Sequence, residues 1–284
     1  MIRIAGAPIS WGVCEVPGWG YRLPAGRVLA EMAALGLTAT EVGPDGYLPA
    51  DPAERADVTG RHGLEVAGGF VPAVLHDPAH DPVPGVVATL AGWSGVLVLA
   101  AATGGDGYDA RPELDGTGWR TLLTNLDRLL AAAADRGITA VLHPHVGTMV
   151  ETPAEVYRVA EDSRIPLCLD TGHLLAGGTD PAALAREVPG RVAHVHLKDV
   201  DAGWAERVRA GEVAYTDAVR AGMYRPLGGG DVDVAGIVAT LGASGYAGWY
   251  VLEQDTMLAA APPPGEGPVA EVRESLEYLR AVAP

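Results

Sequence analysis

Short apolar runs alternate along the chain with longer segments whose apolar positions recur at helical spacing. The apolar runs predict eight strands, at residues 2–7, 37–42, 64–71, 96–101, 138–143, 166–170, 192–197 and 249–253. The segments between them, rich in Ala, Leu and Arg, predict helices at residues 24–35, 53–61, 117–136, 153–161, 181–188, 232–241 and 269–282. The proline-rich stretch 76–84 predicts a loop. No linker divides the repeat, so we expect an α/β protein whose residues 1–284 form a single (β/α)8 barrel.

One charged segment, residues 201–230, interrupts this repeat after the seventh predicted strand. Its pattern predicts a helix between Trp204 and Ala221. Residues 9–20 form a second long connection, after the first predicted strand. Each segment follows a strand, so both should lie on the rim formed by the carboxyl ends of the strands.

Polar side chains interrupt the apolar pattern where the predicted strands end. Because strand side chains alternate between faces, His194, His196 and Lys198 share one face of their strand. The residues at the carboxyl ends of five separate strands are Glu41, His143, Asp170, His196 and Glu253. Active sites of barrel enzymes form on this rim, and the mixed nitrogen and oxygen donors suit Mn²⁺, Co²⁺, Zn²⁺ or Fe²⁺. His194 lies two residues deeper and is expected to be a packed core histidine, and Cys168 a small core residue.

Composition narrows the class of partner. The formal net charge of −16 and the pI near 4.8 argue against nucleic acid and against an anionic membrane surface. No apolar run reaches the roughly 18 residues of a membrane span, and the first residues lack a signal-peptide pattern. Cys14 and Cys168 cannot form a disulfide framework, so we expect a cytoplasmic protein. We expect its partner to be a small-molecule polyol or keto-sugar substrate. The sequence leaves open whether the protein forms a homo-oligomer.

Lys198 is the only lysine among the 20 basic residues. Lysine can donate and accept a proton, whereas arginine effectively cannot. A lysine kept on a strand face with two histidines therefore indicates acid–base chemistry. The structural alternative is a buried ion pair with Asp199 or another carboxylate of the rim.

Three segments together resemble the xylose-isomerase-like barrel superfamily of sugar isomerases, epimerases and related metal enzymes. They are Cys168 to His173, His194 to Asp199 and Val251 to Glu253. Within that superfamily, residues 7–12 (APISWG), 40–44 (TEVGP) and 143–148 (HPHVGT) are similar to the inosose dehydratase group. The resemblance extends over nearly the whole chain.

This resemblance implies four metal ligands, which are His143, Asp170, His196 and Glu253. Most sugar epimerases carry glutamate where this chain has His143, so His145 and Glu151 remain alternatives for that ligand. The positions of Glu41 and His173 usually face substrate or hydrogen-bond to the ligands. We expect Glu41 to act as base or substrate orienter, with Lys198 or His173 as the acid. The candidates for substrate binding are Trp11, His145 and Arg225.

The expected function is metal-dependent enolisation of a polyhydroxy ketone, and the resemblance favours dehydration of an inosose (2-keto-myo-inositol). The alternatives in the same chemistry are a ketose 3-epimerase and an aldose–ketose isomerase. A sugar-binding barrel without catalysis would need a closed coordination sphere around a structural metal. Endonuclease activity also occurs in the superfamily, but the acidic chain offers no basic groove for nucleic acid.

Overall fold

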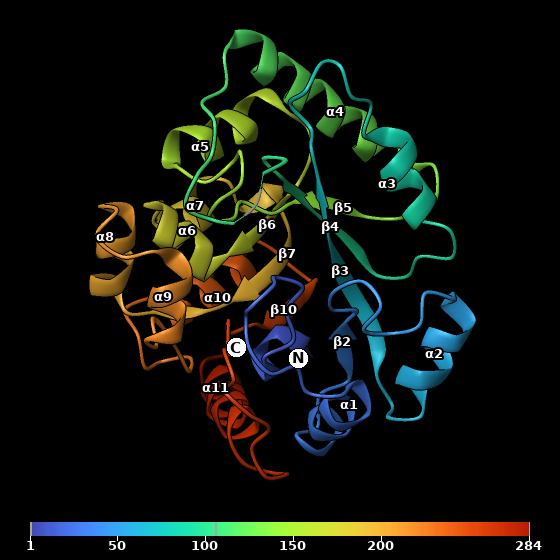
Figure 1. Ribbon diagram of the computed structural model, residues 1–284, viewed down its shortest axis with the longest axis vertical. Helices are drawn as coiled ribbons and strands as arrows, with labels where there is room; N and C mark the ends of the chain where they lie inside the picture. Colours follow the sequence, from blue (N-terminus) through green and yellow to red (C-terminus); the bar gives the residue numbers. More distant parts are fainter. Residues whose placement is uncertain (1, 106, 284) are drawn as a thin grey trace.

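The apolar runs form strands because a parallel sheet covered by helices is buried on both faces. In the computed structural model, which describes residues 2–105 and 107–283, eight parallel strands close into a barrel (Figure 1). The strands are β1 (Arg3–Gly6), β2 (Ala39–Glu41), β3 (Glu65–Ala73), β4 (Val96–Ala101), β5 (Ala140–Leu142), β6 (Leu167–Asp170), β7 (Val192–Leu197) and β10 (Trp249–Leu252). Around the barrel they follow the order β1-β10-β7-β6-β5-β4-β3-β2. The predicted (β/α)8 barrel is confirmed.

Helices surround the strands, and α11 next to α1 closes the ring at the bottom of Figure 1. They are α1 (Ala25–Ala34), α2 (Pro52–Gly60), α3 (Val83–Thr89), α4 (Gly116–Ala134), α5 (Pro153–Asp162), α6 (Thr171–Gly177), α7 (Pro181–Glu187), α10 (Val234–Ala243) and α11 (Pro268–Val282). Short 3₁₀ turns occur at η1 (Pro8–Trp11) and η2 (Pro189–Arg191). Side-chain caps start several helices, since Asp51, Asp115 and Asp180 each accept two backbone N–H groups of the first turn. No helix among residues 2–105 and 107–283 combines the length and apolarity needed to cross a membrane.

Two helices were missing from the sequence-based prediction. Residues 76–84 were expected to be a loop, but α3 begins at Val83, where Pro84 occupies the first turn and needs no amide hydrogen. Helix α6 begins directly after β6, because Asp170 accepts hydrogen bonds from the backbone N–H groups of Gly172 and His173. The sequence pattern did not predict this helix, because its N-cap residue, Asp170, is also the last residue of the strand.

The segment 201–230 forms two helices, where the sequence predicted one. α8 (Ala202–Arg209) and α9 (Tyr215–Arg220) are separated by a turn at Gly211, whose φ of 69° favours glycine. A two-stranded antiparallel sheet, β8 (Asp199–Val200) with β9 (Tyr224–Arg225), ties the segment to the end of β7. The backbone N–H of Tyr215 donates to Asp109 in the loop after β4. The segment therefore lies on the predicted rim.

Two apolar clusters fill the barrel interior beneath the polar rim. One packs small side chains of β1, β2 and β3, including Ala5, Ala39 and Ala67, with Trp249 and Val251 of β10. The other packs Val98, Val141 and Cys168 against Phe70. Cys168 is fully buried, as expected for a core residue. The strand ends above these clusters are therefore held on a packed support.

Candidate active site

Asp170, His196 and Glu253 converge where β6, β7 and β10 end. Asp170 and His196 are direct register partners on neighbouring strands, and Val251 of β10 is the register partner of His196. One donor atom from each of the three residues lies within 4.8 Å of the others. The strand alternation and the barrel order that the sequence predicts thus place two carboxylates and one imidazole at one point.

The imidazole of His196 lies between the carboxylates of Glu253 and Asp170 on one side and the carboxylate of Glu41 on the other. Its Nδ1 is 2.5 Å from Oε2 of Glu253 and 3.5 Å from Oδ2 of Asp170. Its Nε2 lies 3.0 Å from Oε1 of Glu41, and the same oxygen lies 2.8 Å from Nε2 of His194. Burial favours the neutral ring, but the carboxylates of Glu253 and Glu41 raise the pKa of His196 well above its usual value. His194, expected to be only a packed core residue, is therefore a hydrogen-bonding partner of Glu41.

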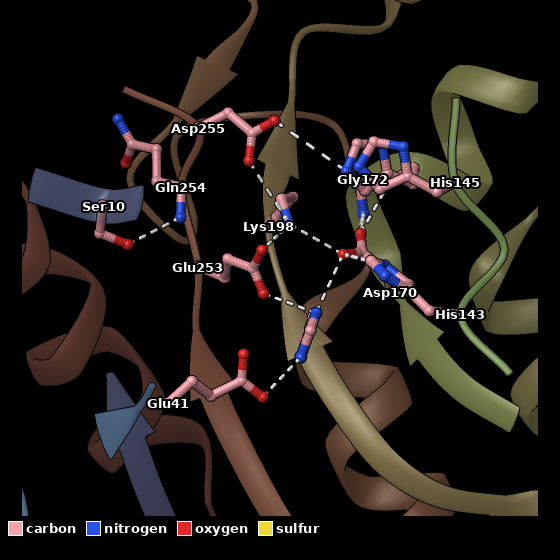
Figure 2. Close-up of polar contacts among 12 residues, drawn as sticks. Ser10, Glu41, His143, His145, Asp170, Gly172, Lys198, Glu253, Gln254 and Asp255 are labelled. Atoms are coloured by element: carbon pink, nitrogen blue, oxygen red, sulfur yellow. Dashed lines mark hydrogen bonds and ion pairs between the residues drawn. The ribbon is translucent and has the colours of Figure 1, made fainter. Parts of the chain in front are cut away.

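Lys198 is fully buried and lies among three carboxylates (Figure 2). Its Nζ is 2.8 Å from Oδ2 of Asp170, 2.8 Å from Oε1 of Glu253 and 3.5 Å from Oδ1 of Asp255. Burial opposes the ammonium form, but these carboxylates hold the pKa of Lys198 well above its usual value. Gly172 makes room for the side chain, since a Cβ there would lie 2.5 Å from Cβ of Lys198. The buried ion pair therefore exists, with Asp170 and Glu253 as partners.

Asp199, the other partner suggested for Lys198, has a different role. Its carboxylate accepts hydrogen bonds from the backbone N–H groups of Val200, Gly228 and Val232. It therefore organises the turn between β9 and α10 and leaves Lys198 to the carboxylates of the rim.

The three candidates for the ligand at the end of β5 are directed differently. Nε2 of His143 lies 3.0 Å from Oδ2 of Asp170. His145 turns its Nδ1 to the backbone oxygen of Val146, at 2.7 Å. Glu151 accepts a 2.7 Å hydrogen bond from the backbone N–H of Gly147 and lies 3.5 Å from Nε of Arg111. Of the three, His143 is the one in contact with Asp170.

His173 stands beside this cluster. Its ring lies 3.6 Å from that of His145, centroid to centroid, and its Nε2 is 4.0 Å from Oδ2 of Asp255. Burial is the main cause that lowers the pKa of His173 well below its usual value, and His145 adds to the effect. The ring is therefore neutral at pH 7.

Asp255, Tyr215 and Tyr224 are site residues that the sequence analysis missed. The hydroxyl of Tyr215 donates to Oδ2 of Asp255 at 2.7 Å and lies 2.9 Å from the hydroxyl of Tyr224. Burial raises the pKa of Asp255 to about 6, against the attraction of Lys198. Asp255 could have been found, because it lies two residues beyond Glu253. Tyr215 begins α9 and Tyr224 lies in β9, in the 201–230 segment, where no strand periodicity pointed to them.

Two residues expected to bind substrate are directed elsewhere. Trp11 is fully buried, and its indole N–H donates to Glu31 at 2.8 Å, so neither face of its ring is free to stack on a sugar. Arg225 lies on the correct rim, but its exposed side chain pairs with Asp201 at 3.5 Å. A carboxylate decides the direction of each side chain, Glu31 for Trp11 and Asp201 for Arg225.

The residues of this cluster fit a divalent cation. Within the described part of the chain, Nδ1 of His196 and Oε2 of Glu253 are buried and make no hydrogen bond, although they approach each other to 2.5 Å. Buried polar atoms normally have partners, and a cation shared by imidazole and carboxylate would supply one. A mixed set of nitrogen and oxygen donors suits Mn²⁺, Co²⁺, Zn²⁺ or Fe²⁺.

Comparison with known proteins identifies the family of this chain. The model of the family "Xylose isomerase-like TIM barrel" matches residues 29–282. The chain belongs to this family. It is 32% identical over 280 residues to an inosose dehydratase of Geobacillus kaustophilus (strain HTA426), covering 92% of this chain and 90% of that protein. It is also 33% identical over 267 residues to the rhizopine catabolism protein MocC of Rhizobium meliloti, covering 89% and 82%. Among solved structures of the family fold, an L-ribulose 3-epimerase superposes with a TM-score of 0.69 at 18% identity, covering 99% of this chain and 94% of the epimerase.

The buried histidines should make the metal-free protein sensitive to acid. Burial lowers the pKa of His145 to about 3, whereas in the unfolded chain it is near 6.5. Between these values the unfolded chain binds the extra proton, so stability is present above pH 6.5 and is lost as the pH falls. We expect the titration of His145 alone to lower the free energy of unfolding by about 1–2 kcal/mol between pH 6.5 and pH 5.

This expectation is measured by denaturant unfolding of the chelator-treated protein at both pH values. The His145→Gln variant is the control, because it removes this titration and keeps every other histidine. The wild type should lose more stability than the variant over the same interval. Equal losses of stability in the two proteins would show that His145 does not cause the acid sensitivity.

Proposed function

We propose that the protein is a divalent-metal-dependent lyase that dehydrates an inosose. The observation that carries the proposal is the convergence of Asp170, His196 and Glu253 around a buried Lys198 at the carboxyl ends of the strands. Relatives named inosose dehydratase, 26–32% identical over 92% of this chain, support the choice of substrate. The acidic chain and its buried polar site are consistent with a small uncharged polyol.

His143, Asp170, His196 and Glu253 would hold the ion. When bound, it supplies Lewis-acid stabilisation of the negative charge that develops on the carbonyl oxygen of the substrate. Two carboxylates offset the charge of the cation in a site that excludes water, where electrostatic effects are strongest.

The other residues of the site would move the protons of the dehydration. His173 is neutral and one of its ring nitrogens has no partner within the described residues, so it is equipped to accept the α-proton of the ketone. Lys198 is held as an ammonium and would donate a proton to the departing β-hydroxyl, which leaves as water. The resulting enol takes up a proton at the carbon that lost the hydroxyl and becomes a 1,2-diketone. Glu41, considered as base from the sequence, is directed to His194 and His196.

Ketose 3-epimerisation or aldose–ketose isomerisation is the alternative, because both begin with the same removal of an α-proton. The superposition on an L-ribulose 3-epimerase shows the shared fold. The two classes part after enolisation, when the enolate either expels the β-hydroxyl or is reprotonated. Nothing in the described structure favours a barrel that binds sugar without catalysis.

A substrate panel separates these functions. Metal-loaded protein is incubated with a series of inososes and ketoses, and the products are followed by NMR spectroscopy and mass spectrometry. We expect loss of water from an inosose and no change in the ketoses. If epimers or isomers form without loss of water, the protein is an epimerase or isomerase instead of a dehydratase. If no compound of the panel is converted, both proposals are wrong.

A further inference from the structure

Glu41 reaches the site from the end of β2, across the barrel interior from β7. It is 5% exposed, and its Oε1 lies 2.8 Å from Nε2 of His194 and 3.0 Å from Nε2 of His196. Figure 2 shows the side chain of Glu41 with a dashed contact from its carboxylate. Gly68, its register partner on β3, keeps the space open, because a Cβ there would lie 3.3 Å from Oε1 of Glu41. The position of this carboxylate is therefore fixed by its packing and by two histidines.

The contact with Glu41 separates the roles of the two ring nitrogens of His196. The carboxylates around His196 favour its protonated ring in the metal-free chain. Binding of a metal requires the neutral ring, and a neutral imidazole carries one N–H donor and one acceptor nitrogen. A carboxylate can only accept, so Nε2, which faces Glu41, must carry the hydrogen. Nδ1 is then left with its lone pair directed at the space shared with Asp170 and Glu253, where it makes no hydrogen bond within the described residues.

We propose that Glu41 is a positioning residue that fixes the tautomer and ring orientation of His196, so that Nδ1 binds the metal, and that His194 holds Glu41 in place. His194 supports Glu41 because its Nε2 donates to the same oxygen from two residues deeper along β7. Carboxylates hydrogen-bonded to a metal-binding histidine typically strengthen metal binding by 10–100-fold. This inference rests on the proposed metal-dependent function, and it gives Glu41 no contact with substrate.

Two other roles for Glu41 make different predictions. As a general base it would contribute 10²–10⁴-fold to turnover and nothing to metal affinity. As a ligand of a second ion, together with His194 and His196, it would belong to a separate site, since donor atoms of these three residues also lie within 4.8 Å of one another. Metal stoichiometry, metal affinity and turnover therefore separate the three roles.

The test is a titration of the chelator-treated full-length protein with Mn²⁺, in which free Mn²⁺ is followed by EPR spectroscopy. Glu41→Gln keeps the size of the side chain and removes its charge, and His194→Gln removes only the support. Glu31→Gln is the matched control, since Glu31 is a similarly buried carboxylate that accepts from Trp11 on the outside of the barrel. Thermal unfolding of each metal-free variant checks the fold.

We expect one Mn²⁺ per wild-type chain, about 10–100-fold weaker binding in Glu41→Gln and a smaller loss in His194→Gln. Turnover of Glu41→Gln should return to within about tenfold of the wild type at saturating Mn²⁺, and Glu31→Gln should bind like the wild type. Unchanged affinity in Glu41→Gln with a large loss of turnover would overturn the inference, as would two ions in the wild type. If Glu41→Gln does not fold, unchanged affinity in His194→Gln overturns it instead. If the wild-type protein binds no Mn²⁺, the proposed metal-dependent function itself is wrong.

Discussion

Replacing Asp170 by alanine should remove both the bound metal and the activity. Its Oδ2 lies 2.8 Å from Nζ of Lys198 and 3.0 Å from Nε2 of His143, and its Oδ1 caps α6 through the N–H groups of Gly172 and His173. The change therefore withdraws an anionic ligand, the partner of a buried ammonium and the cap that orients His173. Loss of one partner of a buried ion pair costs about 3–5 kcal/mol, so the metal-free variant should also unfold more easily.

Asp170→Asn separates these effects. The amide oxygen can keep the cap of α6 while the negative charge is lost, so this variant should fold and still fail to retain metal after dialysis. Glu253→Gln should behave in the same way, because Glu253 supplies the second anionic oxygen near Nδ1 of His196. Elemental analysis of the dialysed proteins and turnover of an inosose are the measurements. An Asp170→Asn variant with full metal content and full turnover would refute its assignment as a ligand.

Replacing Lys198 by methionine or arginine should lower turnover by about 10²–10⁴-fold while the metal remains bound. Methionine removes the proton donor. Arginine keeps the charge, but it cannot release a proton at neutral pH. The site also fits a lysine closely, since Lys198 is fully buried against Gly172 and forms ion pairs with Asp170 and Glu253.

A second measurement distinguishes this catalytic role from a purely structural ion pair. Without metal, Lys198→Met leaves the carboxylates of Asp170, Glu253 and Asp255 without their cation, so the variant should be less stable than the wild type. A divalent ion binds the folded state and neutralises the same carboxylates, so metal should raise the thermal stability of the variant more than that of the wild type. A fully active Lys198→Arg would show that Lys198 serves only the ion pair.

The sequence predicted the barrel and the centre of the site for a physical reason. Strand periodicity places Asp170 and His196 at the ends of their strands, and a parallel barrel brings all such ends to one rim. Residues outside the strands follow no such rule. Tyr215 reaches Asp255 from the start of α9, in a segment whose path is decided by tertiary contacts, such as that of the Tyr215 backbone N–H with Asp109.

Side-chain direction was the other part that sequence alone could not predict. Trp11 and Arg225 have the residue types and positions expected of substrate contacts, but Glu31 and Asp201 lie close enough to bind them first. The depth of His194 on β7 predicts a core residue, because nothing in the sequence shows that Glu41 crosses the barrel to meet it. These partners are distant in sequence, so only the folded barrel identifies them.

Deuterium incorporation from D₂O tests the central claim, metal-dependent enolisation of an inosose, most directly. Metal-loaded and chelator-treated protein are incubated with the same inosose in D₂O, and the products are analysed by NMR spectroscopy. The account predicts that only the metal-loaded protein releases water and yields a diketone, with deuterium at the carbon that lost the hydroxyl. Equal conversion by the metal-free protein, or the absence of both exchange and water loss in the metal-loaded protein, would contradict it.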